Sequence, residues 1–436
     1  MKPVRAAIDT PDRVKEQLPL ALSGAYIVAE DADWDYATAN TKTHTHCYHI
    51  YPAMMIPQVA RRLIRLYGKA GELLLDPFCG SGTSLVEARL ARMDAIGIDL
   101  NPFAVFLARV KTTDFEIEQI LTEAKALRTR LDELPKHGYN APRPSFYNID
   151  YWFKQAVQED LALLRMAIDQ SISETVRDFF LVAFAATVRE SSNTRRGEYK
   201  LYRIPESALD SYHPQVFPIF WEKLERNWRG LSEFLADRVP HTTVRVYEAD
   251  TRRPLPIDSE SVGLIVTSPP YGDSHTTVAY GQFSRLMLQW LGFPDEVAKS
   301  IDRRALGGQS RSTQVPLHSS TLESVVETIM HQHPRRASQV YQFYADFAEC
   351  FPELTRIVKP LGYACFVVGN RTVKGVRIPT DRILIEIAQP FGWHHITTYH
   401  RRIPNKRMPL RNSPSNRPGD WGDTMTHEHI VILQKR

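Results

Sequence analysis

A glycine-rich turn with an acidic residue at its start occupies residues 76–83, Asp76-Pro77-Phe78-Cys79-Gly80-Ser81-Gly82-Thr83. It follows an apolar run and precedes an apolar helical pattern, so the turn joins a buried strand to a helix. Glycines in such a turn adopt positive φ and let the backbone approach a ligand closely. The next apolar run ends in Asp99, whose carboxylate can accept both hydroxyls of a ribose. Together the two features indicate a site for a nucleotide-type cofactor.

The turn differs from two common phosphate-binding motifs. No lysine follows Gly82, as a P-loop requires, and the GxGxxG spacing of NAD-binding turns is absent. Taken alone, the glycines would equally fit a structural strand–helix turn. Asp99 is the residue that favours the cofactor interpretation.

Both segments resemble motifs of the amino-methyltransferases. Residues 76–83 resemble the motif that cradles the methionine part of S-adenosylmethionine, and residues 97–102 resemble the motif whose acid binds the ribose. Asp250 matches the family's acid near the adenine amine, and residues 49–55 resemble a segment that covers the methionine end in some members. The resemblance implies S-adenosylmethionine as cofactor, held by Tyr51, Asp76, Pro77, Phe78, Cys79, Gly80, Gly82, Thr83, Asp99, Leu100, Asn101 and Asp250.

A second motif, Ser268-Pro269-Pro270-Tyr271, follows an apolar strand. An exocyclic amine of a base is a poor nucleophile, because its lone pair is delocalised into the ring. Acceptors at Ser268 Oγ and the Pro269 carbonyl would favour a pyramidal nitrogen, and the prolines fix the backbone around them. Tyr271 offers a flat face for a flipped base. We expect these four residues to be catalytic by positioning the amine, without a general base of tuned pKa.

Serine in the first position of this motif resembles the cytosine-N4 group of the family, whereas Asp or Asn there is commoner for adenine N6. The resemblance therefore implies a site-specific methyltransferase that modifies the N4 amine of cytosine in duplex DNA by base flipping, within restriction–modification. Three alternatives remain: adenine-N6 methylation, guanine-N2 methylation of transfer RNA, and a DNA-binding module with an inactive cofactor fold. Most SPPY enzymes carry this motif before the glycine motif, and the order is reversed here.

Several cationic segments suit contacts to a nucleic acid. A polar stretch over 189–203 and a run over 400–417 interleave Arg and Lys with Asn, Ser or Pro, and no acid lies in the second run. A solvated surface loop explains each run equally simply. The residues expected on double-stranded DNA are Arg195, Arg196, Lys200, His275, Arg371, Arg401, Arg402, Lys406 and Arg407. A cognate restriction endonuclease is a further possible partner.

Metal and thiol chemistry are disfavoured. His44, His46, Cys47 and His49 alternate along one segment without a second cluster at tetrahedral spacing, so no metal is expected. A nucleophilic cysteine that attacks a ring carbon usually follows a proline, whereas Cys79 follows Phe78.

The order of apolar runs predicts an α/β fold, a Rossmann-like, seven-stranded and mainly parallel methyltransferase sheet with a helical insertion. Polar and mixed residues predict an N-terminal arm over 1–40, and core segments are expected at 41–111, 241–292 and 339–436. The sequence further predicts a mainly helical insertion over 112–240, possibly a DNA-recognition region, and a flexible DNA-facing loop over 293–338, with the basic loop at 400–417.

Bulk composition adds little about partners. A net charge of +4 is weak evidence for a polyanion, and the four cysteines show no CxxC pairing, so reduced thiols are expected. No apolar run approaches the length of a membrane span, and the first residues lack the apolar core of a signal peptide. We therefore expect a soluble, cytoplasmic protein with no membrane partner.

Overall fold

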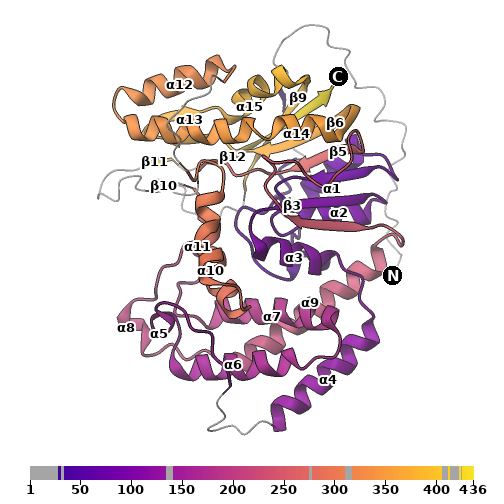
Figure 1. Cartoon of the computed structure of the whole chain (residues 1–436), viewed down its shortest axis with the longest axis vertical. Coiled ribbons are helices and arrows are strands. Elements are labelled where there is room, and N and C mark those ends of the chain that lie inside the picture. Colours follow the sequence, from indigo (N-terminus) through magenta and orange to yellow (C-terminus); the bar gives the residue numbers. More distant parts are fainter. Residues whose placement is uncertain are drawn as a thin grey trace, which may run out of the picture.

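The computed structural model describes residues 28–30, 34–133, 141–273, 277–309, 317–404, 411–412, 422–423 and 425–436. Its centre is a sheet in the order β1-β9-β12-β6-β5-β2-β3-β4 (Figure 1). The strands are β1 (Val28–Glu30), β2 (Leu73–Asp76), β3 (Asp94–Asp99), β4 (Val244–Glu248), β5 (Val262–Thr267), β6 (Val358–Val368), β9 (Trp393–Arg402) and β12 (His427–Lys435).

The predicted seven-stranded, mainly parallel sheet is confirmed as the run from β9 to β4. Only β12 is antiparallel within it, and it pairs with both β6 and β9. An eighth strand, β1, adds to the outer edge of β9 in parallel register. Because β1 lies within residues 1–40, our prediction of an irregular arm there was wrong for this strand, which is too short to give a periodic signal.

Strand order reverses between β5 and β2, since the chain passes from β2 to β3 and later returns to the other side of β2. Parallel strands present their carboxyl ends at one edge, and ligands of open α/β sheets bind in the crevice at such a reversal. Asp76, Asp99 and Thr267 are the last residues of β2, β3 and β5. The sheet therefore brings the two sequence motifs together.

Alternate strand residues bury against two helical layers, as the two-residue period of a strand requires. Leu74 and Val266 pack with one layer, formed by α1 (Pro57–Tyr67), α2 (Thr83–Leu90) and α3 (Pro102–Thr112). Leu75 and Ile265 pack with the opposite layer. That layer contains α12 (Ser320–Met330), α13 (Pro334–Ala348), α14 (Phe351–Ile357), α15 (Thr380–Ala388) and the short η4 (Gln389–Phe391).

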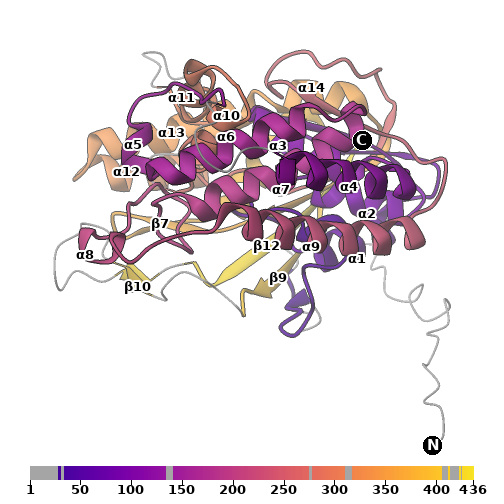
Figure 2. The ribbon, with the colours of Figure 1, turned by 90° about the horizontal axis from the view of Figure 1, so that it is seen from below.

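A separate helical body lies beside the sheet and has its own apolar core (Figures 1 and 2). Phe179, Phe180 and Phe184 at the centre of α7 are fully buried. Helix α10 joins this core through Phe283 and Trp290, and thus connects the helical body to the sheet. The elements here are η3 (His44–Cys47), α4 (Ile117–Glu133), α5 (Ile149–Trp152), α6 (Gln155–Asp169), α7 (Glu174–Ser191), α8 (Glu206–Leu209), α9 (Val216–Asp237) and α10 (Tyr280–Trp290).

The described parts of the segment 293–338, residues 293–309 and 317–338, are mainly helical, contrary to our expectation of a flexible loop. They contain α11 (Asp295–Arg304), α12 and the start of α13. Leu322, Val325, Val326 and Ile329 follow helical spacing, and Leu322 and Ile329 are buried. The polar composition of the segment hides this short apolar stripe, and one such stripe is enough to bury a surface helix on one side.

Two small hairpins lie outside the main sheet. Strands β7 (Arg371–Val373) and β8 (Val376–Ile378) pair antiparallel, and so do β10 (Arg411–Asn412) and β11 (Gly422–Asp423). None of the helices in the described part of the chain combines the length and apolar character that crossing a lipid bilayer demands.

Candidate active site

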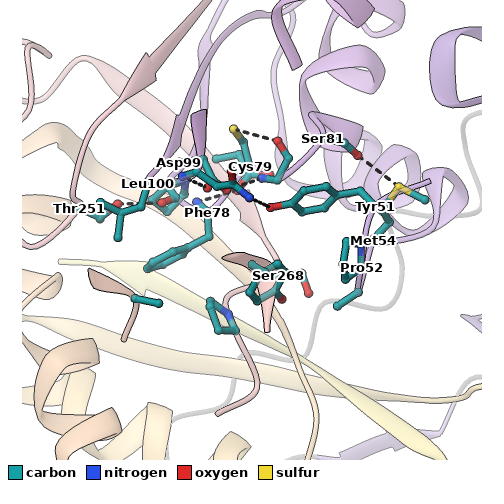
Figure 3. Close-up of a pocket in the computed structure, with 18 of the residues that line it drawn as sticks. Tyr51, Pro52, Met54, Phe78, Cys79, Ser81, Asp99, Leu100, Thr251 and Ser268 are labelled. Carbon is teal, nitrogen blue, oxygen red and sulfur yellow. Dashed lines mark hydrogen bonds between the residues drawn. The ribbon is translucent and has the colours of Figure 1, made fainter. Parts of the chain in front are cut away.

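A pocket opens at the carboxyl ends of β2, β3 and β5, where the two motifs meet (Figure 3). Asp99 and Leu100 lie on one side of it and Tyr51 and Met54 on the other, with Ser268 along the wall between them. All predicted cofactor-binding residues except Gly82 line this pocket. Pro52, Ala53, Met54, Met55 and Ser81, from the two segments that resemble donor-binding motifs, also line the pocket. Lining residues that the sequence did not indicate are Ala249, Thr251, Tyr280, Ile301, Ala305 and Leu306.

The glycines of the turn serve two different purposes. Gly80 has φ +48°, and its amide donates to Asp99 Oδ2 at 2.9 Å. A side chain at Gly80 would begin 3.3 Å from the Tyr51 ring, inside the pocket. Gly82 has φ +80° and lies against Ala108 of α3, at 3.0 Å from an added Cβ. Gly80 thus keeps the pocket open, whereas Gly82 permits close packing of α2 and α3.

Two buried carboxyl groups anchor the turn. Asp76 Oδ1 accepts from Thr267 Oγ1 at 2.6 Å and from the Phe78 amide at 3.1 Å, and Asp76 Oδ2 accepts from Ser84 Oγ. These bonds tie β2 to β5. Burial raises the pKa of Asp76 to about 6, although its hydrogen bonds favour the ionised form.

Asp99 is held in the same way at the end of β3. Its carboxylate accepts from the Gly80 amide and from the Asn101 amide at 2.8 Å. Burial raises the pKa of Asp99 to about 6, the backbone hydrogen bonds lower it, and the nearby Asp76 raises it further. The group is therefore fixed in direction and titrates just below neutral pH.

Tyr51 covers the pocket from the helical body. Its hydroxyl accepts from Asn101 Nδ2 at 3.0 Å, and Asn101 also caps α3 by accepting from the Phe103 amide at 3.0 Å. The Tyr51 ring stacks on Tyr280 with centroids 5.9 Å apart. Residues from three distant segments therefore fix one wall of the pocket.

Asp250 is engaged in an ion pair and does not present an open hydrogen-bond acceptor. Arg252 donates to both oxygens of Asp250, at 2.9 and 2.7 Å, and also lies 3.2 Å from Asp346. Burial raises the pKa of Asp250, but the Arg252 hydrogen bonds and charge outweigh this and lower it overall. The carboxylate is therefore ionised and immobilised at the pocket wall.

Ser268 and Tyr271 are the start of a hydrogen-bonded chain. Ser268 Oγ donates to the Tyr271 hydroxyl at 3.1 Å, and that hydroxyl donates to Glu428 Oε1 at 2.8 Å. Arg401 Nη1 donates to Glu428 Oε2. Burial and the Glu428 charge raise the pKa of Tyr271, so its hydroxyl remains protonated. Sequence reasoning missed Glu428, which faces the motif only through the register of β12 against β9.

The described residues predicted to contact DNA come from different elements: Arg195, Arg196 and Lys200 follow α7, Arg371 begins β7, and Arg401 and Arg402 end β9. Arg195 and Arg196 are exposed in the helical body, with Lys200 half-buried nearby, and Arg402 is exposed and paired with Asp35 at 2.9 Å. Arg401 and Arg371, also predicted to contact DNA, are buried. Each turns toward a carboxylate, Glu428 for Arg401 and Asp273 for Arg371. His275, Lys406 and Arg407 lie outside the described residues.

Comparison with known proteins places this geometry in a family. A family model described as DNA methylase matches residues 28–109. The chain is 39% identical over 422 residues to the Type II methyltransferase M.MvaI of Kocuria varians, covering 92% of this chain and 93% of that protein. It is 22% identical to the Type II methyltransferase M.BsoBI of Geobacillus stearothermophilus, over 91% and 87% of the two chains.

A shorter match concerns an RNA-modifying enzyme. The chain is 42% identical over 89 residues to a tRNA (guanine(10)-N2)-dimethyltransferase of Methanothermobacter thermautotrophicus, covering 19% of this chain and 25% of that protein. The match with M.MvaI spans nearly the whole of both chains, and this extent decides the family.

The chain belongs to the Type II DNA methyltransferases. It is a site-specific DNA methyltransferase of the restriction–modification type, and its methyl donor is S-adenosylmethionine. The pocket suits a nucleoside-bearing donor for two reasons. Asp99 presents an oriented carboxylate, and the glycine turn leaves space at Gly80 that a Cβ would fill.

Proposed function

We propose that the protein methylates the N4 amine of cytosine in duplex DNA, after the base has been flipped out of the helix. The observation that carries the proposal is the direction of the Ser268 hydrogen bond. Because Ser268 Oγ donates to Tyr271, its lone pairs remain available to accept from an amine at the pocket wall. A neutral acceptor at this position suits the cytosine amine, as the resemblance of the motif implies.

The donor would be held by the residues around the two strand ends. Asp99 would accept the ribose hydroxyls, and Asp250 would lie near the adenine amine. The rest of the donor molecule would be enclosed by Tyr51, by the turn from Asp76 to Thr83, and by Leu100 and Asn101. The bound donor supplies an electrophilic methyl group on a sulfonium sulfur.

The catalytic motif would act by orientation. Ser268 Oγ and the Pro269 carbonyl would accept the hydrogens of the amine, which withdraws it from conjugation with the ring. Pro269 and Pro270 restrict the backbone, so these acceptors keep their direction. Tyr271 would position the extruded base, with its own hydroxyl held by Glu428. Positioning then provides most of the rate.

Duplex DNA would be held by cations on the described surface, Arg195, Arg196, Lys200 and Arg402, and by His275, Lys406 and Arg407. Buried Arg371 and Arg401 would help to hold the site by pairing with Asp273 and Glu428. We further propose that the protein is cytoplasmic and that a cognate restriction endonuclease is its partner.

Adenine-N6 methylation is the second candidate, because the amines of adenine and cytosine react by the same chemistry. The Asn or Asp that is commoner for adenine is only a few atoms larger than the serine at position 268. Methylation of transfer RNA has less support, since two tRNA-modifying relatives match 19% and 40% of this chain, whereas M.MvaI matches 92% of it.

The test is to express the protein in cells that lack DNA methylation and to sequence their DNA with detection of modified bases. We expect N4-methylcytosine within one short sequence. Marks on adenine N6 alone would contradict the cytosine assignment. Ser268→Ala should lower the methylation rate strongly, whereas Ser232→Ala should leave it unchanged. Ser232 is a suitable control because its hydroxyl only donates to Trp228 O within α9.

A further inference from the structure

A second cavity lies in the helical body, apart from the donor pocket. Its walls come from the end of α7, from the loop that follows, from α9 and from the segment before Tyr51. The lining residues are His49, Ile50, Ala186, Arg189, Glu190, Thr194, Arg195, Arg196, Gly197, Lys223 and Arg226. No step of the proposed methyl transfer uses this cavity.

Positive charge dominates the cavity lining, which contains five cations and a single carboxylate. That carboxylate, Glu190, is already bound by Lys223 at 2.6 Å and lies 3.9 Å from Arg196. Arg195 uses its Nε to donate to Arg203 O at 3.2 Å. Within the described residues, its two terminal nitrogens have no acceptor. The lining thus has donors in excess and attracts an anion.

A buried polar atom also points to a ligand in this cavity. His49 is only 3% exposed, and its Nδ1 donates to Ile50 O at 2.5 Å. Its other nitrogen, Nε2, is buried without a hydrogen-bond partner among the described residues. Unsatisfied buried polar atoms are rare in folded proteins. Because Nδ1 carries the ring proton, Nε2 is an acceptor, and a water molecule that donates both to Nε2 and to an anion in the cavity would satisfy it.

Two aromatic rings connect the cavity to the donor pocket. The Arg189 guanidinium lies over the Phe283 ring, at 4.4 Å from its centroid. The Phe283 ring also contacts Tyr51, whose centroid is 5.8 Å away and which lines the donor pocket. An anion held beside Arg189 would therefore be linked to the donor pocket through Phe283 and Tyr51.

We infer that this cavity binds a backbone phosphate of the DNA substrate, close to the flipped nucleotide. The inference rests on the proposed function. It favours a phosphate within a polymer over a free anion, because exposed Arg195 and Arg196 extend the positive charge from the cavity onto the surface. Guanidinium groups are well suited to phosphate oxygens, and such contacts position a protein on DNA without reading its sequence.

The test compares two charge-matched double variants. Arg195→Gln with Arg196→Gln removes two exposed cations of the cavity. Arg65→Gln with Lys69→Gln removes two exposed cations near the end of α1, on the sheet's own helical layer. Affinity for a short duplex is measured as a function of salt concentration. Binding of S-adenosylmethionine and the midpoint of thermal unfolding are recorded for both variants.

We expect the cavity variant to bind DNA roughly tenfold more weakly and to reduce the salt slope by about one, as the loss of one phosphate contact predicts. Donor binding and thermal unfolding should match the wild type, and the control should retain the wild-type salt slope. An unchanged slope in the cavity variant, or equal changes in both variants, would overturn the inference.

Two further outcomes separate the possible ligands. Inorganic phosphate that competes with DNA at the cavity at millimolar concentration would show a free-anion site instead. Duplex RNA bound more tightly than DNA, with the same loss in the cavity variant, would overturn the assignment to DNA. Failure of the wild type to methylate any DNA would contradict the proposed function, and it would do so without altering the comparison of salt slopes.

Discussion

The Tyr271 hydroxyl lies 2.8 Å from the Glu428 carboxylate, although 157 positions separate the two residues in the chain. The other oxygen of Glu428 accepts from buried Arg401, whose Nε also donates to Trp34 O at 3.1 Å. The aromatic ring of the motif proposed to be catalytic is therefore held by a residue of β12, which Arg401 of β9 holds in turn.

Glu428→Gln should lower kcat by roughly tenfold to a hundredfold while the KM for the donor changes little, because a ring that is poorly fixed positions the base less well. Tyr271→Phe removes the same contact and keeps the ring, so it should show a loss of similar size. The effects of the two changes should not add in the double variant, and single-turnover methylation of DNA measures all three. Fully additive losses would show that Glu428 acts by another route.

Donor binding should depend on the ionisation of Asp99. Its pKa is raised to about 6, so the carboxylate that accepts hydroxyl groups is present above that pH and is lost as the pH falls through about 6. Asp76 titrates in the same range, and the two carboxyl groups will titrate as a pair. The dissociation constant for S-adenosylmethionine, measured by calorimetry across this range, should rise as the pH falls.

Asp99→Asn should bind the donor weakly and lose most of this pH dependence. Asp250→Asn is the matched control, because the lowered pKa of Asp250 keeps it ionised throughout. Without donor, the sign of the stability effect is opposite. The folded-state pKa of Asp99 exceeds its unfolded value, so protonation of Asp99 stabilises the folded protein at low pH, and this contribution is lost as the pH rises through about 6. An Asp99→Asn variant with unchanged pH dependence of donor binding would contradict the role of Asp99.

Gly82→Ala should destabilise the protein more than Gly71→Ala does. Both glycines have φ near +80°, so alanine at either position adds backbone strain of about 1–2 kcal/mol. Gly71 has nothing within 4 Å of an added Cβ, whereas Gly82 meets Ala108 of α3 at 3.0 Å. The difference in unfolding free energy between the variants, measured in urea, isolates the helix contact. Equal losses of unfolding free energy in the two variants would show that α2 and α3 can move apart without a cost in stability.

Much of the donor pocket could be predicted because it depends on local patterns. Asp76, Gly80 and Asp99 follow short apolar runs, and the carboxyl ends of parallel strands meet at one edge whatever the loops do. Ser268 follows a third such run on the neighbouring strand. Local sequence therefore predicted both the fold and which residues converge.

The contacts that could not be predicted depend on long-range register. Glu428 reaches Tyr271 because β12 lies between β6 and β9, and nothing near residue 428 indicates that placement. Likewise Ile301 and Leu306 line the donor pocket from a segment expected to be a loop. The burial of Arg371 and Arg401 against carboxylates could not be predicted either, since nothing near each cation in the sequence identifies its partner, Asp273 or Glu428.

The antiparallel placement of β12 has a consequence for the newly synthesised chain. Strands β2, β3 and β5, which carry the donor pocket, emerge from the ribosome long before residue 428. Domains commonly begin to fold during synthesis, and pairings between distant segments form late. We therefore expect the nascent protein to form the elements of its proposed cofactor site first, and to fix the Tyr271 ring only after β12 has paired with β6 and β9.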